Sequence, residues 1–227
     1  MKLIEVKNLS AFYEDKQVFS SLNFHVEQGD YLCILGENGS GKTTLMRLLL
    51  GFRVKKSGSI VYNGLSRNKI GYLPQISDSQ KDFPAGVNEV IMSGFASKSF
   101  FGLGYNKNQK QQAQKNMELL EISRLKNRSF KELSGGQQQK VLLCRALCAA
   151  EKAILMDEPI NGLDTASREE FYALIRKLND SGIAVIMISH DINRALKEGK
   201  HILHIFDNGY FYGTADEYAE SGFGGAK

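Results

Sequence analysis

Hydrophobic and polar residues alternate along the first part of the chain. The stretches LIEVKNL and QVFSSLNFHVEQGD show this period of two, which is typical of half-buried strands. A continuous apolar run from Tyr31 to Leu35 follows and ends at a glycine. We therefore expect a small antiparallel sheet that leads into a buried strand. The leucines of KTTLMRLLLGF then recur at helical spacing, with Gly51 as a stop.

The pattern changes twice more. After short strands at SIVYNG and IGYLPQ, the segment from Ile76 to Arg145 has helical periodicity and no buried strand. Strands and helices alternate again from AILMDEP, through a helix from about Ala166 to Asp180, to IAVIMISHD. The chain ends with HILHIFDNGYFYG, in which Asp-Asn-Gly predicts a hairpin turn.

This order of elements predicts an α/β fold. We expect a mainly parallel sheet with an N-terminal antiparallel β-subdomain and an inserted helical subdomain. One domain would cover residues 1–227, with the core in 1–75 and 146–227 and the helical insert in 76–145.

Composition excludes several classes of protein. The 29 basic and 25 acidic residues give a net charge of +4 without a basic stripe, so we expect no nucleic-acid partner. No apolar run reaches the length of about 18 residues needed to span a bilayer, and the start lacks the apolar core of a signal peptide. We expect a cytoplasmic chain unless a partner holds it at a membrane. Cys33, Cys144 and Cys148 lie in apolar contexts, which favours buried packing over metal ligation.

A glycine-rich loop follows the buried strand. The sequence GENGSGKTT fits the phosphate-loop pattern, in which two glycines bracket four residues and a lysine and a hydroxyl residue follow. Consecutive N–H groups would converge on phosphate oxygens, Lys42 would neutralise the β and γ charges, and Thr43 would place its hydroxyl on Mg²⁺. Without the flanking strand and helix, the pattern would indicate only a glycine turn. The predicted nucleotide contacts in this loop are Gly36, Asn38, Gly39, Ser40, Gly41, Lys42, Thr43 and Thr44.

Polar residues also end three later strands. Asp157 follows an apolar run and is expected to hold the magnesium, while Glu158 could act as general base on the attacking water. The alternative is that one of the two caps the turn before Pro159. Gln75 and His190 end neighbouring strands and could point at the γ-phosphate, although a lone histidine at a strand end is more often structural.

A second anion-binding feature occurs in LSGGQQQKVLLCRAL. Ser134, Gly135 and Gly136 precede a helix and offer a hydroxyl, free N–H groups and the helix dipole. There is no lysine and no strand leading into it. If it lies on the helical insert, away from Lys42, a second copy turned head to tail could complete the site. Two nucleotides would then be buried in a two-fold dimer.

Together these motifs resemble those of the ABC ATPases over essentially the whole chain. Leu133 to Gln137 resembles the family's signature motif, and the phosphate loop and the Asp-Glu pair occur in the family's order. Lys140 stands where the family more often has arginine, outside the motif. The resemblance implies a RecA-like P-loop NTPase core that binds ATP and Mg²⁺.

The resemblance also assigns roles to single residues. It implies that Tyr13 stacks on adenine and that Gln75 lies at the joint between the core and the helical subdomain, next to the metal. The segment from Asn161 to Asp164 resembles the loop that crosses the dimer interface, so Asp164 joins Ser134, Gly135, Gly136 and Gln137 among the nucleotide-binding residues of the dimer. His190 resembles the histidine that senses the γ-phosphate.

A lone ATPase domain of this kind resembles the separate subunits of bacterial importers. The implied partners are a membrane permease, a second copy of the chain and an extracytoplasmic solute-binding protein, and the implied location is the inner face of the cell membrane. In the family, a groove beside the glutamine loop receives a helix of the permease. The phenylalanines between Ile76 and Tyr105 suit such a groove, but they could equally pack the insert's own core.

The cargo is indicated by one local resemblance. DFPAGVNEVIMSG is similar to a stretch in ATPases that serve zinc and manganese uptake. His201 and His204 do not support a metal site, since residues three apart on a strand point to opposite faces. The alternatives are another cargo, or mechanotransmission in lipoprotein release or cell division. An ABC protein of ribosomes or DNA would carry two such domains or long coiled coils, and a small-molecule kinase would not need the signature motif.

Overall fold

The structure is a computed structural model that describes residues 1–13, 16–75, 84–98, 104–207 and 209–223. Its larger sheet has six strands in the order β5-β6-β7-β3-β8-β9, of which all but β9 run parallel. This confirms the expected α/β fold with a mainly parallel sheet. The strands are β3 (Tyr31–Gly36), β5 (Ile70–Leu73), β6 (Ala153–Asp157), β7 (Ala184–Ile188), β8 (His201–Phe206) and β9 (Gly209–Thr214).

The central strand β3 contributes side chains to two separate cores. Tyr31, Cys33 and Leu35 pack on one face of the sheet, while Leu32 and Ile34 pack on the other. Because alternate residues of a strand point to opposite faces, a strand that is covered on both sides must be apolar throughout. This is why YLCIL is an uninterrupted hydrophobic run.

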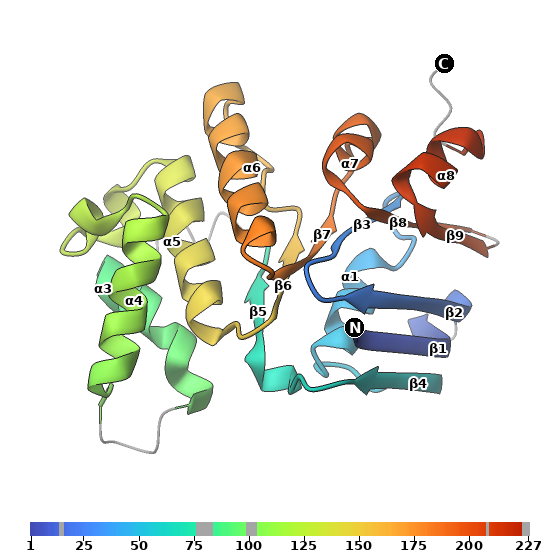
Figure 1. Cartoon of the computed structure of the whole chain (residues 1–227), viewed down its shortest axis with the longest axis horizontal. Helices are drawn as coiled ribbons and strands as arrows, with labels where there is room; N and C mark the ends of the chain where they lie inside the picture. The colour runs from blue at the N-terminus through green and yellow to red at the C-terminus, as the bar shows by residue number, and fades with distance from the viewer. Residues whose placement is uncertain (14–15, 76–83, 99–103, 208, 224–227) are drawn as a thin grey trace.

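The two faces are covered by different layers. One face packs against α6 (Thr165–Asp180), α7 (Ile192–Glu198) and helices of the insert. The other packs against α1 (Lys42–Leu49) and a three-stranded antiparallel sheet in the order β2-β1-β4. The strands of that smaller sheet are β1 (Lys2–Tyr13), β2 (Lys16–Glu27) and β4 (Ser57–Tyr62). Figure 1 shows the smaller sheet at the lower right. The expected antiparallel start of the chain is therefore present, with SIVYNG as its third strand.

Helices dominate the region between β5 and β6. The helices are α3 (Val87–Met92), α4 (Lys107–Leu119) and α5 (Gly135–Ala149), joined by 3₁₀ turns at Ser93–Lys98, Ser123–Leu125 and Phe130–Glu132. A further 3₁₀ turn, Arg67–Lys69, precedes β5. The helices α3, α4 and α5 lie together on the left of Figure 1. Phe95 is 3% exposed and packs in the core of these helices. This phenylalanine therefore packs the insert's own core rather than lining a groove for the permease. Phe83, Phe100 and Phe101 lie outside the described residues.

The end of the chain contains a helix that the sequence analysis missed. The expected hairpin joins β8 to β9, and α8 (Ala215–Glu220) follows it. Thr214 accepts a hydrogen bond from the N–H of Glu217, whose carboxylate accepts one from the N–H of Thr214. This capping box is visible in the sequence as Thr-x-x-Glu and could have predicted the helix.

Two glycines allow neighbouring segments to approach the backbone of α5. A Cβ atom on Gly71 of β5 would lie 2.5 Å from the carbonyl oxygen of Ala146, and one on Gly94 would lie 2.1 Å from that of Arg145. Such contacts require the backbone to move. Gly71 thus lets the edge strand β5 approach α5 closely, and Gly94 does the same for the 3₁₀ turn Ser93–Lys98 within the helical insert.

We expect Gly94→Ala to lower the free energy of unfolding by about 1–3 kcal/mol, the usual cost of overpacking. Urea denaturation followed by circular dichroism would measure it. Gly209→Ala is the control, since a Cβ there meets no described atom within 4 Å. Equal stabilities of the two variants would contradict the close approach.

Candidate active site

The ends of four parallel strands bring the predicted polar residues to one edge of the sheet. β3 leads into the phosphate loop, β6 ends at Asp157, and Gln75 and His190 follow β5 and β7 within two residues. Parallel strands point their carboxyl ends the same way, and open α/β sheets bind ligands beyond those ends. A cavity of about 860 Å³ lies there. It is lined by Gln17, Val18, Asn38, Gly39, Ser40, Gly41, Lys42, Thr43, Thr44, Gln75, Glu158, Asn161, His190 and Asp207.

The phosphate loop is held in a conformation that its glycines make possible. Gly41, at the N-cap of α1, has a φ of 99°, and a Cβ atom there would lie 2.1 Å from Val18. The hydroxyl of Ser40 is buried and has no hydrogen-bond partner among the described residues. An unpartnered buried hydroxyl costs free energy, so a phosphate oxygen at this point would satisfy it. The loop therefore fits the phosphate chain of a nucleotide.

Lys42 provides the positive charge of the loop. Its ammonium donates hydrogen bonds of 2.8 Å to the carbonyl oxygens of both Gly36 and Glu37. Burial lowers the pKa of Lys42, and the carboxylates of Glu158 and Asp157 oppose that effect. Because the nearby carboxylates favour the charged form, Lys42 can act as a cation toward β and γ phosphates.

Asp157 and Thr43 form an oxygen pair suited to magnesium. The Thr43 hydroxyl donates to the Asp157 carboxylate, which is 4% exposed. Burial and the neighbouring Glu158 raise the pKa of Asp157, while Thr43, Arg47 and Lys42 lower it. Magnesium commonly takes one carboxylate, waters and substrate phosphates rather than a cage of protein ligands. The pair fits this chemistry, and no cluster of three or more His, Cys, Asp or Glu ligands occurs among the described residues.

Glu158 is contacted by three side chains. Its Oε2 accepts from Gln75 Nε2 at 3.3 Å and from Asn161 Nδ2, and its Oε1 pairs with His190 Nε2. The backbone of Glu158 is left-handed, with a φ of 48°. A non-glycine residue rarely adopts this conformation, which is found more often at functional sites. The structure thus brings together Gln75, Glu158 and His190, three of the residues predicted for hydrolysis.

Asn161 is the contact that the sequence analysis missed. The resemblance predicts that its loop crosses a dimer interface; within the chain, the Asn161 amide also donates to the carboxylate of Glu158. The N–H of Asn161 also donates to the carbonyl of Glu158 at 3.3 Å, which closes a short turn. A turn of this kind brings positions i and i+3 together, so the spacing of Glu158 and Asn161 was the available signal. Gln17, Val18 and Asp207 were also missed as lining residues.

The signature motif lies apart from this cavity. Ser134 caps α5, accepting from the N–H of Gln137 at 3.4 Å. Ser134, Gly135, Gly136 and Gln137 are all absent from the lining of the nucleotide cavity. In Figure 1, α5 lies on the far side of β5 and β6 from α1. Its neighbour is the start of α6, since a Cβ on Gly136 would lie 3.0 Å from Ser167 Oγ.

Each of the remaining residues singled out in the sequence either makes a contact within the fold or has a side chain that the structure does not describe. Asp164 caps α6, and hydrogen bonds from the side chain and backbone of Ser167 lower its pKa. The side chain of Tyr13 lies outside the described residues. His201 bonds to Asp30 and His204 to Tyr218, at 2.8 and 2.6 Å, so their separate structural roles agree with the sequence analysis.

The three cysteines are buried and form no disulfide. Burial raises the pKa of Cys33, and the Cys148 hydrogen bond and burial raise that of Cys144. Neutral, buried thiols pack as small apolar side chains. Every helix in the described part of the chain is too short or too polar to span a bilayer.

Comparisons with known proteins agree with this arrangement. A sequence model of the ABC transporter family matches residues 19–161, more than half of the chain. The chain is 33% identical to the zinc uptake system ATP-binding protein ZurA of Listeria innocua, covering 96% of this chain and 88% of ZurA. It is also 33% identical to the manganese transport system ATP-binding protein MntB of Halalkalibacterium halodurans, covering 95% and 88%.

Solved structures show the same fold. An ABC transporter in an inward-facing conformation superposes with a TM-score of 0.87 at 30% identity, covering 96% of this chain and 85% of the other. An ATP-binding cassette in its ADP conformation superposes with a TM-score of 0.84 at 24% identity, covering 97% and 94%, which supports the fold alone. Sequence, fold and the family's motifs thus agree: the chain belongs to the ABC transporter family, in which it is an ATPase that couples ATP hydrolysis to transport.

Proposed function

We propose that this chain is the motor subunit of an importer, and that it binds two ATP molecules between two copies arranged head to tail. The proposal of a dimer rests on one observation: the phosphate loop and the signature motif, which both can bind anions, lie apart within one chain. The cavity with Lys42 has no lining residue from the signature motif, and the N-terminus of α5 presents Ser134, Gly135 and Gly136 elsewhere. Two half-sites on one chain are completed by a two-fold axis.

The residues of the cavity divide the work of hydrolysis. Lys42 and the N–H groups of the phosphate loop hold the β and γ phosphates, while Tyr13 stacks on the adenine. Asp157, Thr43 and Gln75 hold Mg²⁺, which when bound would neutralise charge on the phosphates. Glu158 orients the attacking water and accepts its proton, and His190 faces the γ-phosphate. The three contacts of Glu158 support this role, since they fix the carboxylate at the rim of the cavity.

The division into subdomains follows from the same proposal. Residues 1–75 and 146–227 form the ATP-binding core, and residues 76–145 form the helical subdomain that carries the signature motif. The helix α5 runs from Gly135 to Ala149 and so crosses the boundary at 145. The close approach of Gly71 in β5 to Ala146 in α5 supports a firm joint at this place.

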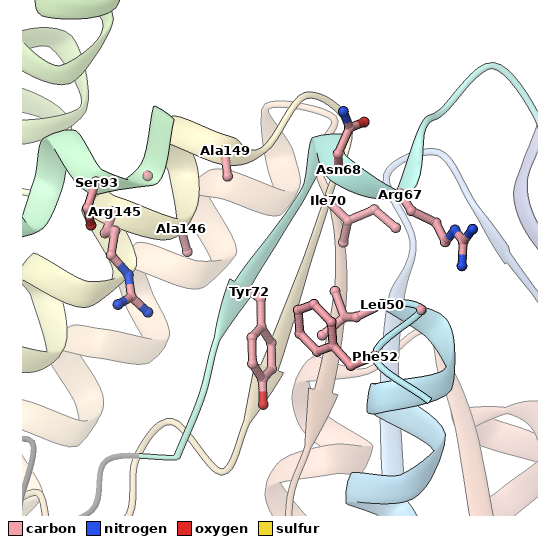
Figure 2. A pocket seen from close by; sticks show the side chains of 12 residues that line it. Leu50, Phe52, Arg67, Asn68, Ile70, Tyr72, Ser93, Arg145, Ala146 and Ala149 are labelled. Atoms are coloured by element: carbon pink, nitrogen blue, oxygen red, sulfur yellow. The ribbon is translucent and has the colours of Figure 1, made fainter. Parts of the chain in front are cut away.

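A permease docks beside this joint in our proposal. A cavity of about 760 Å³ is formed between the end of α1, β5 and α5, as Figure 2 shows. Phe52 is 69% exposed and lies edge-on to Tyr72, with the ring centroids 6.2 Å apart. Arg67 and Arg145 add positive charge to the lining. An apolar surface with basic side chains suits an amphipathic helix that carries an acidic residue. Docking would hold the chain on the cytoplasmic face of the membrane.

The cargo we propose is a divalent metal such as zinc or manganese, delivered by an extracytoplasmic solute-binding protein. The names of ZurA and MntB support it, together with the similarity of DFPAGVNEVIMSG. Asp82 and Phe83 of this stretch lie outside the described residues. Motors for another cargo or for lipoprotein release share the same hydrolytic residues, so the partner alone distinguishes them.

We expect Glu158→Gln to keep ATP binding and to lower turnover by about 10²–10⁴, because the amide cannot accept the proton of the attacking water. ATPase assays and size-exclusion chromatography with ATP would measure turnover and the accumulated dimer. Glu151→Gln is the control, since that carboxylate is exposed and pairs with Lys69 at 3.1 Å, outside the cavity. Near-normal hydrolysis by Glu158→Gln would refute the role of general base.

We expect Ser134→Arg to leave ATP binding by the monomer unchanged and to prevent ATP-driven dimerisation, because a bulky cation would occupy the half-site. Light scattering and binding of a fluorescent ATP analogue would be compared. Ser66→Arg serves as a control at an exposed position that does not line the nucleotide cavity. Equal loss of binding and dimerisation would rule out the shared site.

The cargo is tested with the permease encoded beside this chain. Both would be purified together and reconstituted in vesicles with the solute-binding protein. We expect zinc or manganese to stimulate ATP hydrolysis several-fold over calcium and magnesium controls. A stable complex whose rate of ATP hydrolysis does not change with zinc or manganese would contradict the proposed cargo. The proposed motor role would not be affected by that result.

A further inference from the structure

Four charged side chains join α6 to α7 in an alternating row. Glu169 binds the two terminal nitrogens of Arg194 at 3.0 and 2.9 Å. Arg194 Nε forms an ion pair with Glu198 at 3.1 Å that lacks hydrogen-bond geometry. Glu198 accepts a hydrogen bond from Arg176 at 2.6 Å. We call this row Glu169, Arg194, Glu198 and Arg176 the ion ladder. It connects two helices that are otherwise separated in sequence by β7.

The inner members of the ion ladder are shielded from water. The side chains of Glu198 and Arg194 are 3% and 11% exposed, whereas Glu169 and Arg176 at the ends are 56% and 44% exposed. The guanidinium of Arg194 also lies over the ring of Tyr172, 3.9 Å from its centroid. A two-point Arg–carboxylate contact fixes orientation as well as distance. Arg194 therefore holds α7 against α6 in one geometry.

Each of these helices begins next to a residue that contacts Glu158. The segment from Asn161 to Asp164 leads into α6, and His190 immediately precedes the cap of α7. That cap is Asp191, which accepts a hydrogen bond from the N–H of Arg194 at 2.9 Å. A shift of α7 along α6 would consequently move His190 relative to Asn161 and change the hold on Glu158.

We propose that Arg194 is a positioning residue for hydrolysis: through the ion ladder it fixes the distance between the His190 loop and the Asn161 loop. Arg194 does not line the nucleotide cavity. The proposal rests on the roles proposed above for Glu158 and His190. Its consequence is that the two loops respond as one unit when the start of α6 moves.

The test removes the exposed end of the ion ladder. In Glu169→Ala we expect kcat to fall about three- to tenfold with an unchanged KM for ATP, as for other residues that couple elements without touching ligand. The imidazole resonance of His190 should shift in spectra of the histidine-labelled protein. Glu170→Ala is the matched control. Glu170 is the next residue in the chain, and its side chain is 53% exposed. The substitution Glu170→Ala also removes an ion pair, the one with Lys140 of α5. It should keep kcat within about twofold and leave the His190 resonance in place.

Two further variants separate positioning from folding and from the proposed mechanism. Arg194→Lys keeps the charge but cannot make the two-point contact, so we expect the same loss of kcat as in Glu169→Ala. Equal behaviour of Glu169→Ala and Glu170→Ala would overturn the inference, as would a changed KM with constant kcat. His190→Ala tests the underlying mechanism. If it is inactive while Glu169→Ala is normal, only the inference fails; full turnover by His190→Ala would remove both.

Discussion

Five strands of the larger sheet run parallel, and the meeting of the residues proposed for hydrolysis depends on that constraint. Because their carboxyl ends share one edge, residues as distant in sequence as Gln75, Glu158 and His190 meet without a long loop. The same parallel pairing requires crossovers, which bring α1, α6 and α7 onto the faces of the sheet. Each of these helices starts at the edge of the sheet where the carboxyl ends of the parallel strands meet. A shift of one of the helices would therefore also move the site residues that precede it.

The features that could be predicted from the sequence are those that depend on residues close together in the chain. The phosphate loop is determined by a strand, glycines and a helix in succession, and the buried strand by an unbroken apolar run. Asn161 and Arg194 were harder to assign. The contact of Asn161 with Glu158 depends on a turn, and the pairing of Arg194 with Glu169 depends on how two helices settle side by side. Such contacts are set by tertiary packing, which periodicity does not encode.

In the proposed dimer, the helical insert carries half of a site that a second copy of the chain completes. Gly71 lets α5 lie close to the edge strand β5, and a Cβ on Gly136 would come within 3.0 Å of Ser167 at the start of α6. The N-terminus of α5 is thus fixed relative to the loop that leads into α6. In an assembly, a partner approaching that surface would meet the signature motif and the Asn161 loop together. The groove of Figure 2 is also bounded by α5, so the helix that carries the signature motif at its start lines the groove near its end.

The backbone of Glu158 adds a different kind of constraint. A left-handed glutamate costs on the order of 1–3 kcal/mol compared with a relaxed residue. Glycine or asparagine would adopt this conformation more easily. Selection for a robust fold and selection for turnover therefore favour different residues at position 158. In the mechanism proposed above, glutamate at this position lowers the resistance to unfolding in exchange for a catalytic carboxylate, a trade that enzymes commonly make.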